Sequence, residues 1–367
     1  MRALIINSVC GVKSTGRICI EIAEQLELQG YECKIAYGRE NVPAQYKKYA
    51  VRIGNNIDVK MHALQTRIFD NTGFASKGAT LKFLKWAEAY NPDLVWLHNL
   101  HGYYINIEML FDWIKKRPYM QIKWTLHDCW SFTGHCTHFT MVKCEKWKGK
   151  CMNCPQKREY PASYFMDRSE INYIKKKKLF TGIENLTLIT PSKWLANLTR
   201  ESFLAKYPVQ VKNTLIDTNV FKPILSDFKE SHGLDNKKII LGVASVWGEK
   251  KGFNDFLKLA ELLNENFVIV LVGVTKKQIK QFAQNMLGIT RTNNPKELAM
   301  IYSAADVFFN PTYEDTYPTV NLEAKACGTE VVTYNTGGSV ESVEPNRVVP
   351  QGDLDAVKEI IYRITNN

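Results

Sequence analysis

The chain has 367 residues, 45% of them hydrophobic, and a formal net charge of +11 at pH 7. This size and composition predict two folded domains, or one large one, and exclude a disordered or repetitive chain. The start lacks the longer apolar core of a signal peptide, and no apolar run approaches the ~20 residues that a membrane span needs. We therefore expect a cytoplasmic protein, either dissolved or attached to the inner face of the cytoplasmic membrane.

The net charge is unevenly distributed along the chain. Residues 1–214 hold 32 Lys and Arg against 18 Asp and Glu, which gives +14, whereas residues 215–367 hold 16 against 19, which gives −3. The basic part predicts either an ordinary solvated surface or an anionic partner, such as phospholipid head groups or a lipid diphosphate. The run Lys175–Lys178, near Tyr164, Phe165 and Tyr173, is the local candidate for a membrane surface. No nucleic-acid-binding motif is present, so we expect no nucleic-acid partner.

Strand and helix patterns alternate from the first residues onward. In the first part, a helix is predicted at Ile18–Gln29, and strands are predicted at Ala3–Asn7, Glu32–Tyr37, Leu94–Leu97, Ile122–Leu126 and Leu186–Thr190. In the second part, the predicted strands are Ile239–Ala244, Phe267–Val272, Val307–Phe309 and Val331–Tyr334, and the predicted helices are Phe253–Asn264, Pro295–Ser303 and Asp353–Ile364. Alternating strands and helices predict parallel sheets, and two such series predict two doubly wound α/β domains.

A glycine-containing loop, residues 11–17, lies between the first predicted strand and the first predicted helix. It lacks the Lys-Ser/Thr pair that follows the last glycine of a P-loop, so that interpretation fails. Gly11 and Gly16 would instead allow the backbone to approach a phosphate closely.

The most informative stretch follows the strand Val307–Phe309. A loop with Glu314 and Asp315 leads into a helix that carries Glu323. Ligands bind at the carboxyl ends of strands in open α/β sheets, and a helix beginning there offers N–H groups and a favourable dipole to an anion. Phosphate-binding backbone flanked by the two acids Asp315 and Glu323 matches a nucleotide sugar, which combines phosphates with hydroxyl groups.

These residues resemble a known family. Glu323-Ala-Lys-Ala-Cys-Gly-Thr-Glu-Val-Val is similar to the second half of the donor-site motif of retaining glycosyltransferase family 4, and Asp315 stands eight residues earlier, where the motif has Glu. The resemblance implies the GT-B fold, two Rossmann-like doubly wound parallel-sheet domains facing across a cleft. It divides the chain into an acceptor-side domain at 1–214, a nucleotide-sugar domain at 215–352, and a helix at 353–367 that crosses back to the first domain.

The resemblance also implies an activity. It is the retaining, metal-independent transfer of a sugar from a UDP- or GDP-sugar to a hydroxyl of a lipid-linked glycan, in the branch of the family that builds bacterial surface polysaccharides. Two rival functions stay open: a nucleotide-sugar epimerase or phosphorylase on the same fold, and a non-catalytic, zinc-stapled module that binds an anionic ligand.

Roles for individual residues follow from the family motif. Lys251 would neutralise the donor diphosphate, with Lys250 in place of a missing Arg, and His127 would reach the donor sugar from the first domain. Asp315 would bind sugar hydroxyls and Glu323 the ribose. The remaining expected donor contacts are Gly11, Gly16, Glu314, Thr316, Tyr317, Thr319 and Val320.

Four cysteines lie close together in an insert at 134–157. They are Cys136, Cys144, Cys151 and Cys154, and the last two have the spacing of a zinc knuckle. In a cytosolic protein such a cluster favours metal over disulfide, and the insert is too poor in aliphatic residues to bury a core of its own. We predict structural Zn²⁺ on these four, with free thiols or disulfides as the alternative, and expect no cofactor for catalysis. A similar cysteine run, beginning with His127-Asp-Cys-Trp-Ser-Phe-Thr-Gly-His-Cys136, occurs in the polysaccharide branch of the family.

Overall fold

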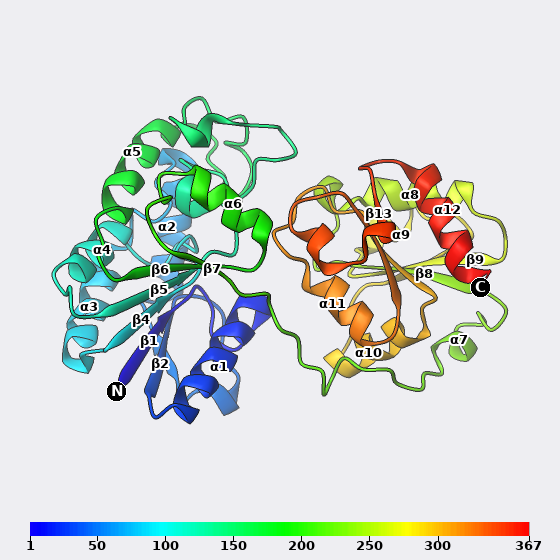
Figure 1. Cartoon of the computed structure of the whole chain (residues 1–367), viewed down its shortest axis with the longest axis horizontal. Coiled ribbons are helices and arrows are strands. Elements are labelled where there is room, and N and C mark those ends of the chain that lie inside the picture. Colours follow the sequence, from blue (N-terminus) through cyan, green and yellow to red (C-terminus); the bar gives the residue numbers. More distant parts are fainter. Residues whose placement is uncertain (367) are drawn as a thin grey trace. The chain divides into compact units, whose positions relative to one another are not determined.

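The computed structural model describes residues 1–366, which form two compact units, with the division after Lys212 (Figure 1). This division lies two residues before the expected boundary. Each unit contains one parallel sheet with helices on both faces, so the prediction of two Rossmann-like α/β domains is confirmed.

The first unit contains a seven-stranded parallel sheet. Its strands, in spatial order, are β3 (Ala50–Arg52), β2 (Glu32–Tyr37), β1 (Arg2–Ile6), β4 (Leu94–Leu97), β5 (Gln121–Thr125), β6 (Leu186–Thr190) and β7 (Val209–Val211). Its helices are α1 (Lys13–Leu28), α2 (Asn56–Phe69), α3 (Lys77–Tyr90), α4 (Ile107–Lys115), α5 (Ser169–Phe180) and α6 (Lys193–Glu201).

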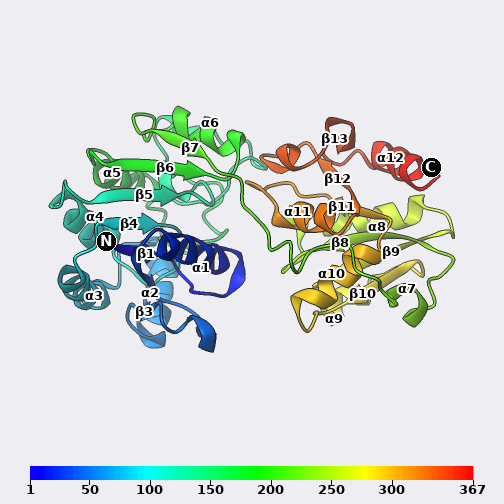
Figure 2. The ribbon, with the colours of Figure 1, turned by 60° about the horizontal axis from the view of Figure 1, so that its bottom comes forward.

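Alternating side chains of β1 supply two separate cores. Ala3 and Ile5 pack with α1 on one face, whereas Leu4 and Ile6 pack with α3 and α4 on the other (Figure 2). Because successive residues of a strand point to opposite faces, a strand covered on both sides must be apolar throughout. This requirement explains why the continuous apolar runs in the sequence predicted these strands correctly.

The second unit contains, within residues 213–366, a six-stranded parallel sheet. Its strands, in spatial order, are β10 (Met286–Ile289), β9 (Phe267–Val272), β8 (Lys238–Val243), β11 (Val307–Asn310), β12 (Glu330–Tyr334) and β13 (Val348–Val349). Its helices are α7 (Phe228–Ser231), α8 (Phe253–Leu262), α9 (Lys276–Ile279), α10 (Pro295–Ala304), α11 (Thr319–Ala326) and α12 (Leu354–Thr365).

The last helix, α12, packs as part of the second unit. Its apolar side chains Val357, Ile360 and Ile361 are buried in the core that α8 forms with one face of the sheet, and α10 and α11 cover the other face (Figure 2). The sequence led us to expect a segment that crosses back to the first domain. The apolar face of α12 completes the core of the unit to which it is joined, and the expected crossing stays a prediction.

The strand orders place a topological switch point in each unit. In the first unit it lies between β1 and β4, and in the second between β8 and β11. The connections that leave two such neighbouring strands run in opposite directions, which opens a crevice at the carboxyl ends of the strands. The loops after β8 and β11 carry the lysines and acids singled out in the sequence.

Candidate active site

Two loops meet at the switch point of the second unit. The lysine turn (residues 249–252) follows β8, and the acid loop (residues 311–318) follows β11. Gly252 ends the lysine turn with φ +67°, and a Cβ on it would lie 2.4 Å from the carbonyl oxygen of Pro311. Only glycine satisfies both the left-handed backbone and this close approach. The lysine turn and the acid loop therefore pack directly against each other.

The predicted cations and acids form ion pairs across these two loops. Lys251 Nζ lies 2.7 Å from Asp315 Oδ2, and Lys250 Nζ lies 3.1 Å from Glu314 Oε2. The Glu314 side chain is only 1% exposed, whereas both lysine side chains are more than a third exposed. The structure thus brings the predicted phosphate-binding lysines together with the predicted sugar-binding acids.

The helix α11 begins directly after the acid loop. Its first residue is Thr319, preceded by Pro318, so the N–H groups of its first turn point toward the same end of the sheet. Glu323 is 9% exposed, and its Oε2 accepts a hydrogen bond from the hydroxyl of Tyr302 at 3.2 Å. The remaining predicted donor contacts of this unit, Thr316, Tyr317 and Val320, lie in the acid loop or the first turn of α11.

A buried polar network holds the N-terminal end of α11. Asn321 Nδ2 donates to Ser342 Oγ at 2.8 Å and to Ser339 Oγ at 3.2 Å, and Asn310 Nδ2 donates to Asn321 Oδ1 at 2.8 Å. Thr333 joins the same network through Ser339 at 2.7 Å. Since a buried amide must find partners, this network fixes the helix against the ends of β11 and β12. The sequence did not reveal it.

In the first unit, His127 follows β5, as predicted. Its Nε2 lies 2.9 Å from Nδ1 of His98, which follows the neighbouring strand β4. Burial lowers the pKa of His127 to about 4 and that of His98 well below its usual range, so both rings are neutral at pH 7. One shared N–H therefore links them, and His98 fixes the ring orientation of His127.

A second buried pair lies beside these histidines. His101 Nε2 is 2.7 Å from Asp128 Oδ2. Burial alone would raise the pKa of Asp128, but the attraction of His101 outweighs it and lowers that pKa to about 2. Sequence reasoning missed His98 and His101. The available signal was their position directly after the strand Leu94–Leu97, which matches the position of His127 after its own strand.

The glycine loop of the first unit adopts the conformation that its glycines permit. Gly11 has φ +70°, and its N–H donates to the Gly16 carbonyl at 3.1 Å. A Cβ on Gly16 would lie 3.2 Å from the Gly11 nitrogen, so α1 approaches this loop closely. Nearby, Lys13 pairs with Glu40 at 2.7 Å. The predicted contact of this loop with a phosphate stays a prediction.

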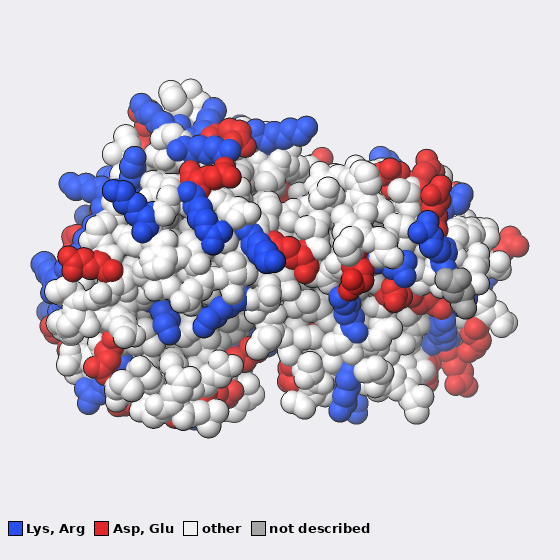
Figure 3. All heavy atoms as spheres, viewed as in Figure 1, with Lys and Arg blue, Asp and Glu red and all other residues white. Residues whose placement is uncertain are grey.

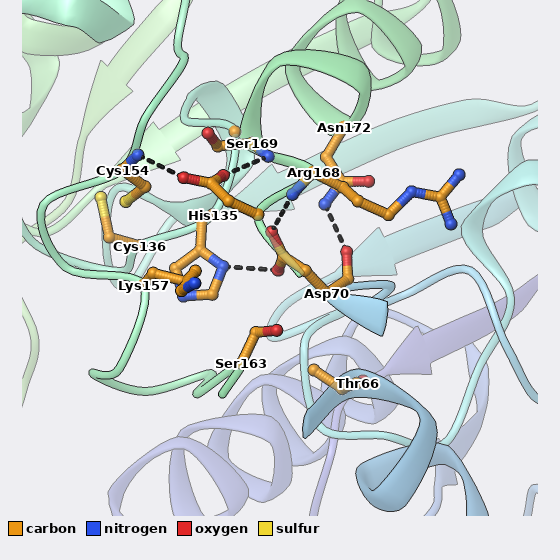
Figure 4. A network of polar contacts seen from close by, with 12 residues as sticks. Thr66, Asp70, His135, Cys136, Cys154, Lys157, Ser163, Arg168, Ser169 and Asn172 are labelled. Atoms are coloured by element: carbon orange, nitrogen blue, oxygen red, sulfur yellow. Dashed lines mark hydrogen bonds and ion pairs between the residues drawn. The ribbon is translucent and has the colours of Figure 1, made fainter. Parts of the chain in front are cut away.

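The cysteine insert is held by a buried network of the first unit (Figure 4). Asp70, at the end of α2, lies 2.5 Å from His135 Nδ1 and accepts the backbone N–H of Arg168 at 2.8 Å. Burial lowers the pKa of His135, but the hydrogen bond to Asp70, the charge of Asp70 and smaller contributions from neighbouring groups together outweigh it and raise that pKa overall. The Cys136 and Cys154 side chains lie next to each other in the same view, and their thiols share a hydrogen bond.

The four cysteines line one small cavity together with Phe139 and Trp147. However, among residues 1–366 no three His, Cys, Asp or Glu side chains are arranged to hold a metal ion. The Cys151 sulfur instead accepts the N–H of Gly134 at 3.2 Å. The arrangement therefore gives no support to the predicted zinc site, which stays a prediction.

The run Lys175–Lys178 does not form a single cationic face. Lys176 is 1% exposed and donates to the carbonyls of Trp130 and Thr133, at 2.8 and 3.1 Å, and Tyr173 is also buried. Lys175 pairs with Glu108 at 2.9 Å. Lys176 therefore adds no charge to the surface, because the helix turns its lysines in different directions, and the interpretation of the run as a membrane-binding cluster stays a prediction.

The basic residues on one face of the first unit do not gather into a single patch. Figure 3 shows Lys and Arg side chains scattered over the visible face of this unit, with uncharged atoms between them. Within residues 1–366, no helix combines the length and the apolar character needed to cross a membrane.

Comparison with known proteins follows the division into units. Residues 226–367 match the family described as "Glycosyl transferases group 1". This match covers most of the second unit. Over the whole chain, the sucrose-phosphate synthase of Thermosynechococcus elongatus has the same fold, with a TM-score of 0.71 at 16% identity, covering 100% of this chain and 90% of that one. The chain thus has the GT-B fold.

Related proteins of named function extend this comparison. The chain is 22% identical to the putative colanic acid biosynthesis glycosyl transferase WcaC of Escherichia coli K12, over 89% of this chain and 81% of the relative. A structure of HepE from Anabaena, in complex with UDP and glucose, matches with a TM-score of 0.65 at 15% identity, covering 100% of this chain and 90% of that one.

Proposed function

We propose that this protein is a glycosyltransferase of family 4. It moves a sugar from a UDP- or GDP-sugar to a hydroxyl of a lipid-linked glycan in bacterial polysaccharide biosynthesis. The transfer retains the anomeric configuration of the sugar and needs no catalytic metal. The observation that carries this proposal is the meeting of the lysine turn, the acid loop and the start of α11 at one switch point. The name of the E. coli relative, which refers to colanic acid, supports the biosynthetic role. HepE, whose structure contains UDP and glucose, supports the donor class.

The chemistry assigned to the second unit follows from charge. Breaking the bond between sugar and diphosphate leaves additional negative charge on the departing group. Lys251 and the N–H groups of the first turn of α11 stabilise that charge as it develops, because they are fixed before the reaction begins. In the free enzyme Lys251 is paired with Asp315. On donor binding Asp315 accepts hydrogen bonds from sugar hydroxyls, and Lys251 turns to the diphosphate.

Glu323 is assigned to the ribose. Its carboxyl is buried and is oriented by the hydroxyl of Tyr302. A carboxylate is a strong acceptor for two adjacent hydroxyls. The acceptor glycan is assigned to the first unit, which carries the positive charge and the neutral His127. In this proposal the departing diphosphate itself assists the incoming hydroxyl on the same face of the sugar.

The proposal is tested by single substitutions at the donor site. Lys251→Ala should lower kcat by about 100-fold or more, because a preorganised charge is lost from the transition state. Glu323→Gln should raise the KM for the donor by about tenfold, since a charged hydrogen bond becomes a neutral one. Released nucleotide is measured with a panel of UDP- and GDP-sugars, with and without a lipid-linked acceptor, and the anomeric configuration of the product is read by NMR.

The matched control is Lys277→Ala, which removes an exposed lysine from α9. It should behave as the wild type. Wild-type rates in both donor-site variants would refute the assignment of these residues. Nucleotide release that never depends on an acceptor would favour an epimerase or phosphorylase, and a chain that binds neither UDP nor GDP would be a non-catalytic module.

A further inference from the structure

Behind the acid loop lies a buried carboxylate with two tyrosine partners. Asp255, in the first turn of α8, is 7% exposed. Its Oδ2 accepts a hydrogen bond from the hydroxyl of Tyr313 at 2.8 Å and another from the hydroxyl of Tyr334 at 3.0 Å. Tyr313 belongs to the acid loop and directly precedes Glu314 and Asp315. Tyr334 is the last residue of β12 and is fully buried.

The two tyrosines therefore have different surroundings although they share one acceptor. Tyr334 is part of the sheet, and its ring also packs against Phe309, with 5.5 Å between ring centroids. Tyr313 lies in a loop without regular structure. Its backbone N–H donates to the Lys250 carbonyl at 2.9 Å, which joins the acid loop to the lysine turn. Burial and the carboxylate of Asp255 raise the pKa of Tyr313 to about 12, so its hydroxyl remains a donor at neutral pH.

The position of Asp255 explains what this arrangement does. Asp255 lies three residues after Gly252, which ends the lysine turn, so the conformation of that turn sets the position of Asp255 in space. Its carboxylate reaches the acid loop through the Tyr313 hydroxyl and reaches the sheet through the Tyr334 hydroxyl. One carboxylate thus joins three elements: the lysine turn with α8, the acid loop, and β12.

From this geometry we propose that Asp255 and Tyr313 are positioning residues, which hold the lysine turn and the acid loop in the arrangement that receives the diphosphate of the donor. The proposal rests on the proposed function and extends it to residues that touch no substrate. If the Tyr313 hydroxyl is removed, the acid loop samples more conformations in the free protein. The loop must then become ordered when the nucleotide binds. Affinity for the nucleotide falls, because the cost of ordering moves into the binding step.

The two tyrosines supply a matched pair of variants. Tyr313→Phe and Tyr334→Phe each remove one phenol hydroxyl from the same carboxylate, so each should lower the melting temperature of the second unit by a similar amount. Tyr313→Phe alone should weaken the binding of UDP or GDP, by about tenfold, which corresponds to the loss of a hydrogen bond to a charged group. Asp255→Ala should reproduce this loss, and Asp255→Asn, which keeps an acceptor oxygen, should restore much of it.

The experiment measures the dissociation constants of UDP and GDP by calorimetry on the full chain, with thermal unfolding of the same samples. Equal affinity in Tyr313→Phe and the wild type, or equal losses in Tyr313→Phe and Tyr334→Phe, would overturn the positioning role. If the wild type binds nucleotide and Lys251→Ala does not, the proposed function stands whatever the tyrosines show. If the wild type binds neither nucleotide, the proposed function fails and this inference fails with it.

Discussion

At the scale of single residues, the structure places a lysine where the sequence indicated a solvated surface. Lys176 lies over the ring of Trp130, with Nζ 3.5 Å from the ring centroid, and donates to two backbone carbonyls. These contacts fix the turn Trp130–Phe132, which follows His127 in the same loop. A run of four lysines predicts a charged face. The burial of one of them could not be predicted, because a sequence does not show which side of a helix packs against another element.

Burial of Lys176 makes stability depend on pH. Desolvation lowers its pKa from 10.5 to about 7. Between these two pH values the lysine is protonated in the unfolded chain but not in the folded chain, so the free energy of unfolding increases as the pH rises. Relative to Lys176→Met, the free energy of unfolding of the wild type should increase by roughly 1.5 kcal/mol between pH 7 and pH 8.5. Below pH 7 the difference in this free energy between the two proteins should become independent of pH. The measurement is chemical denaturation of both proteins across this range.

The control for this prediction is Lys177→Met, the same substitution at the exposed neighbour. Its free energy of unfolding should follow that of the wild type at every pH. A difference between the wild type and Lys176→Met that does not change with pH would show that Lys176 keeps its proton in the folded state.

At the scale of elements, the segment that carries the four cysteines has little regular structure. Between β5 and α5 the structure describes only two short 3-10 turns, Trp130–Phe132 and Lys146–Lys148. The segment is held by a small aromatic cluster, in which Phe139 stacks on Trp147 at 4.9 Å between centroids, and by the Asp70–His135 pair. These contacts provide part of the stabilisation that the zinc ion was predicted to supply.

Metal analysis decides whether zinc is present as well. If the zinc prediction is right, the purified protein should contain about one zinc per chain, as expected for a single four-cysteine site. Cys136→Ser should release it and lower thermal stability, whereas Cys327→Ser, in the second unit, should leave it bound. Zinc-free protein whose four thiols react freely once it is unfolded would contradict the prediction.

Elements also mark the limit of what the sequence could predict at the candidate site. The acid loop, Lys251 and Glu323 were found because each lies within a few residues of a strand end, and such positions can be read locally. His98 and His101 were missed because they are about thirty residues from His127 and become its neighbours only through the pairing of β4 with β5. Asp255 was missed for the same reason, since its partners come from two distant segments.

At the scale of the whole molecule, the alternation of apolar runs was sufficient to predict two parallel-sheet domains. The contacts of the last helix could not be predicted in the same way, because the pattern of an amphipathic helix shows how much of its surface is buried but not against which core. Val357, Ile360 and Ile361 bury their side chains in the second unit. The direction of that apolar face is set by its packing on α8, which lies about a hundred residues earlier.

This packing can be tested in the intact chain. Ile361→Ala should destabilise the second unit by about 2 to 5 kcal/mol, because a buried branched side chain is replaced by a cavity. The exposed neighbour supplies the control, and Glu359→Ala should change stability by less than about 0.5 kcal/mol. Hydrogen exchange followed by mass spectrometry shows which of the two units has lost stability. Faster exchange in the first unit would show that α12 belongs to that unit after all.

The chain divides into its two units after Lys212, and α12 contributes to the core of the second. A single junction makes the halves exchangeable. Under the proposed function, a chimera joined there would replace the acceptor-side half without breaking into the core of the donor-side half. New glycan linkages could then be sought by recombining whole halves.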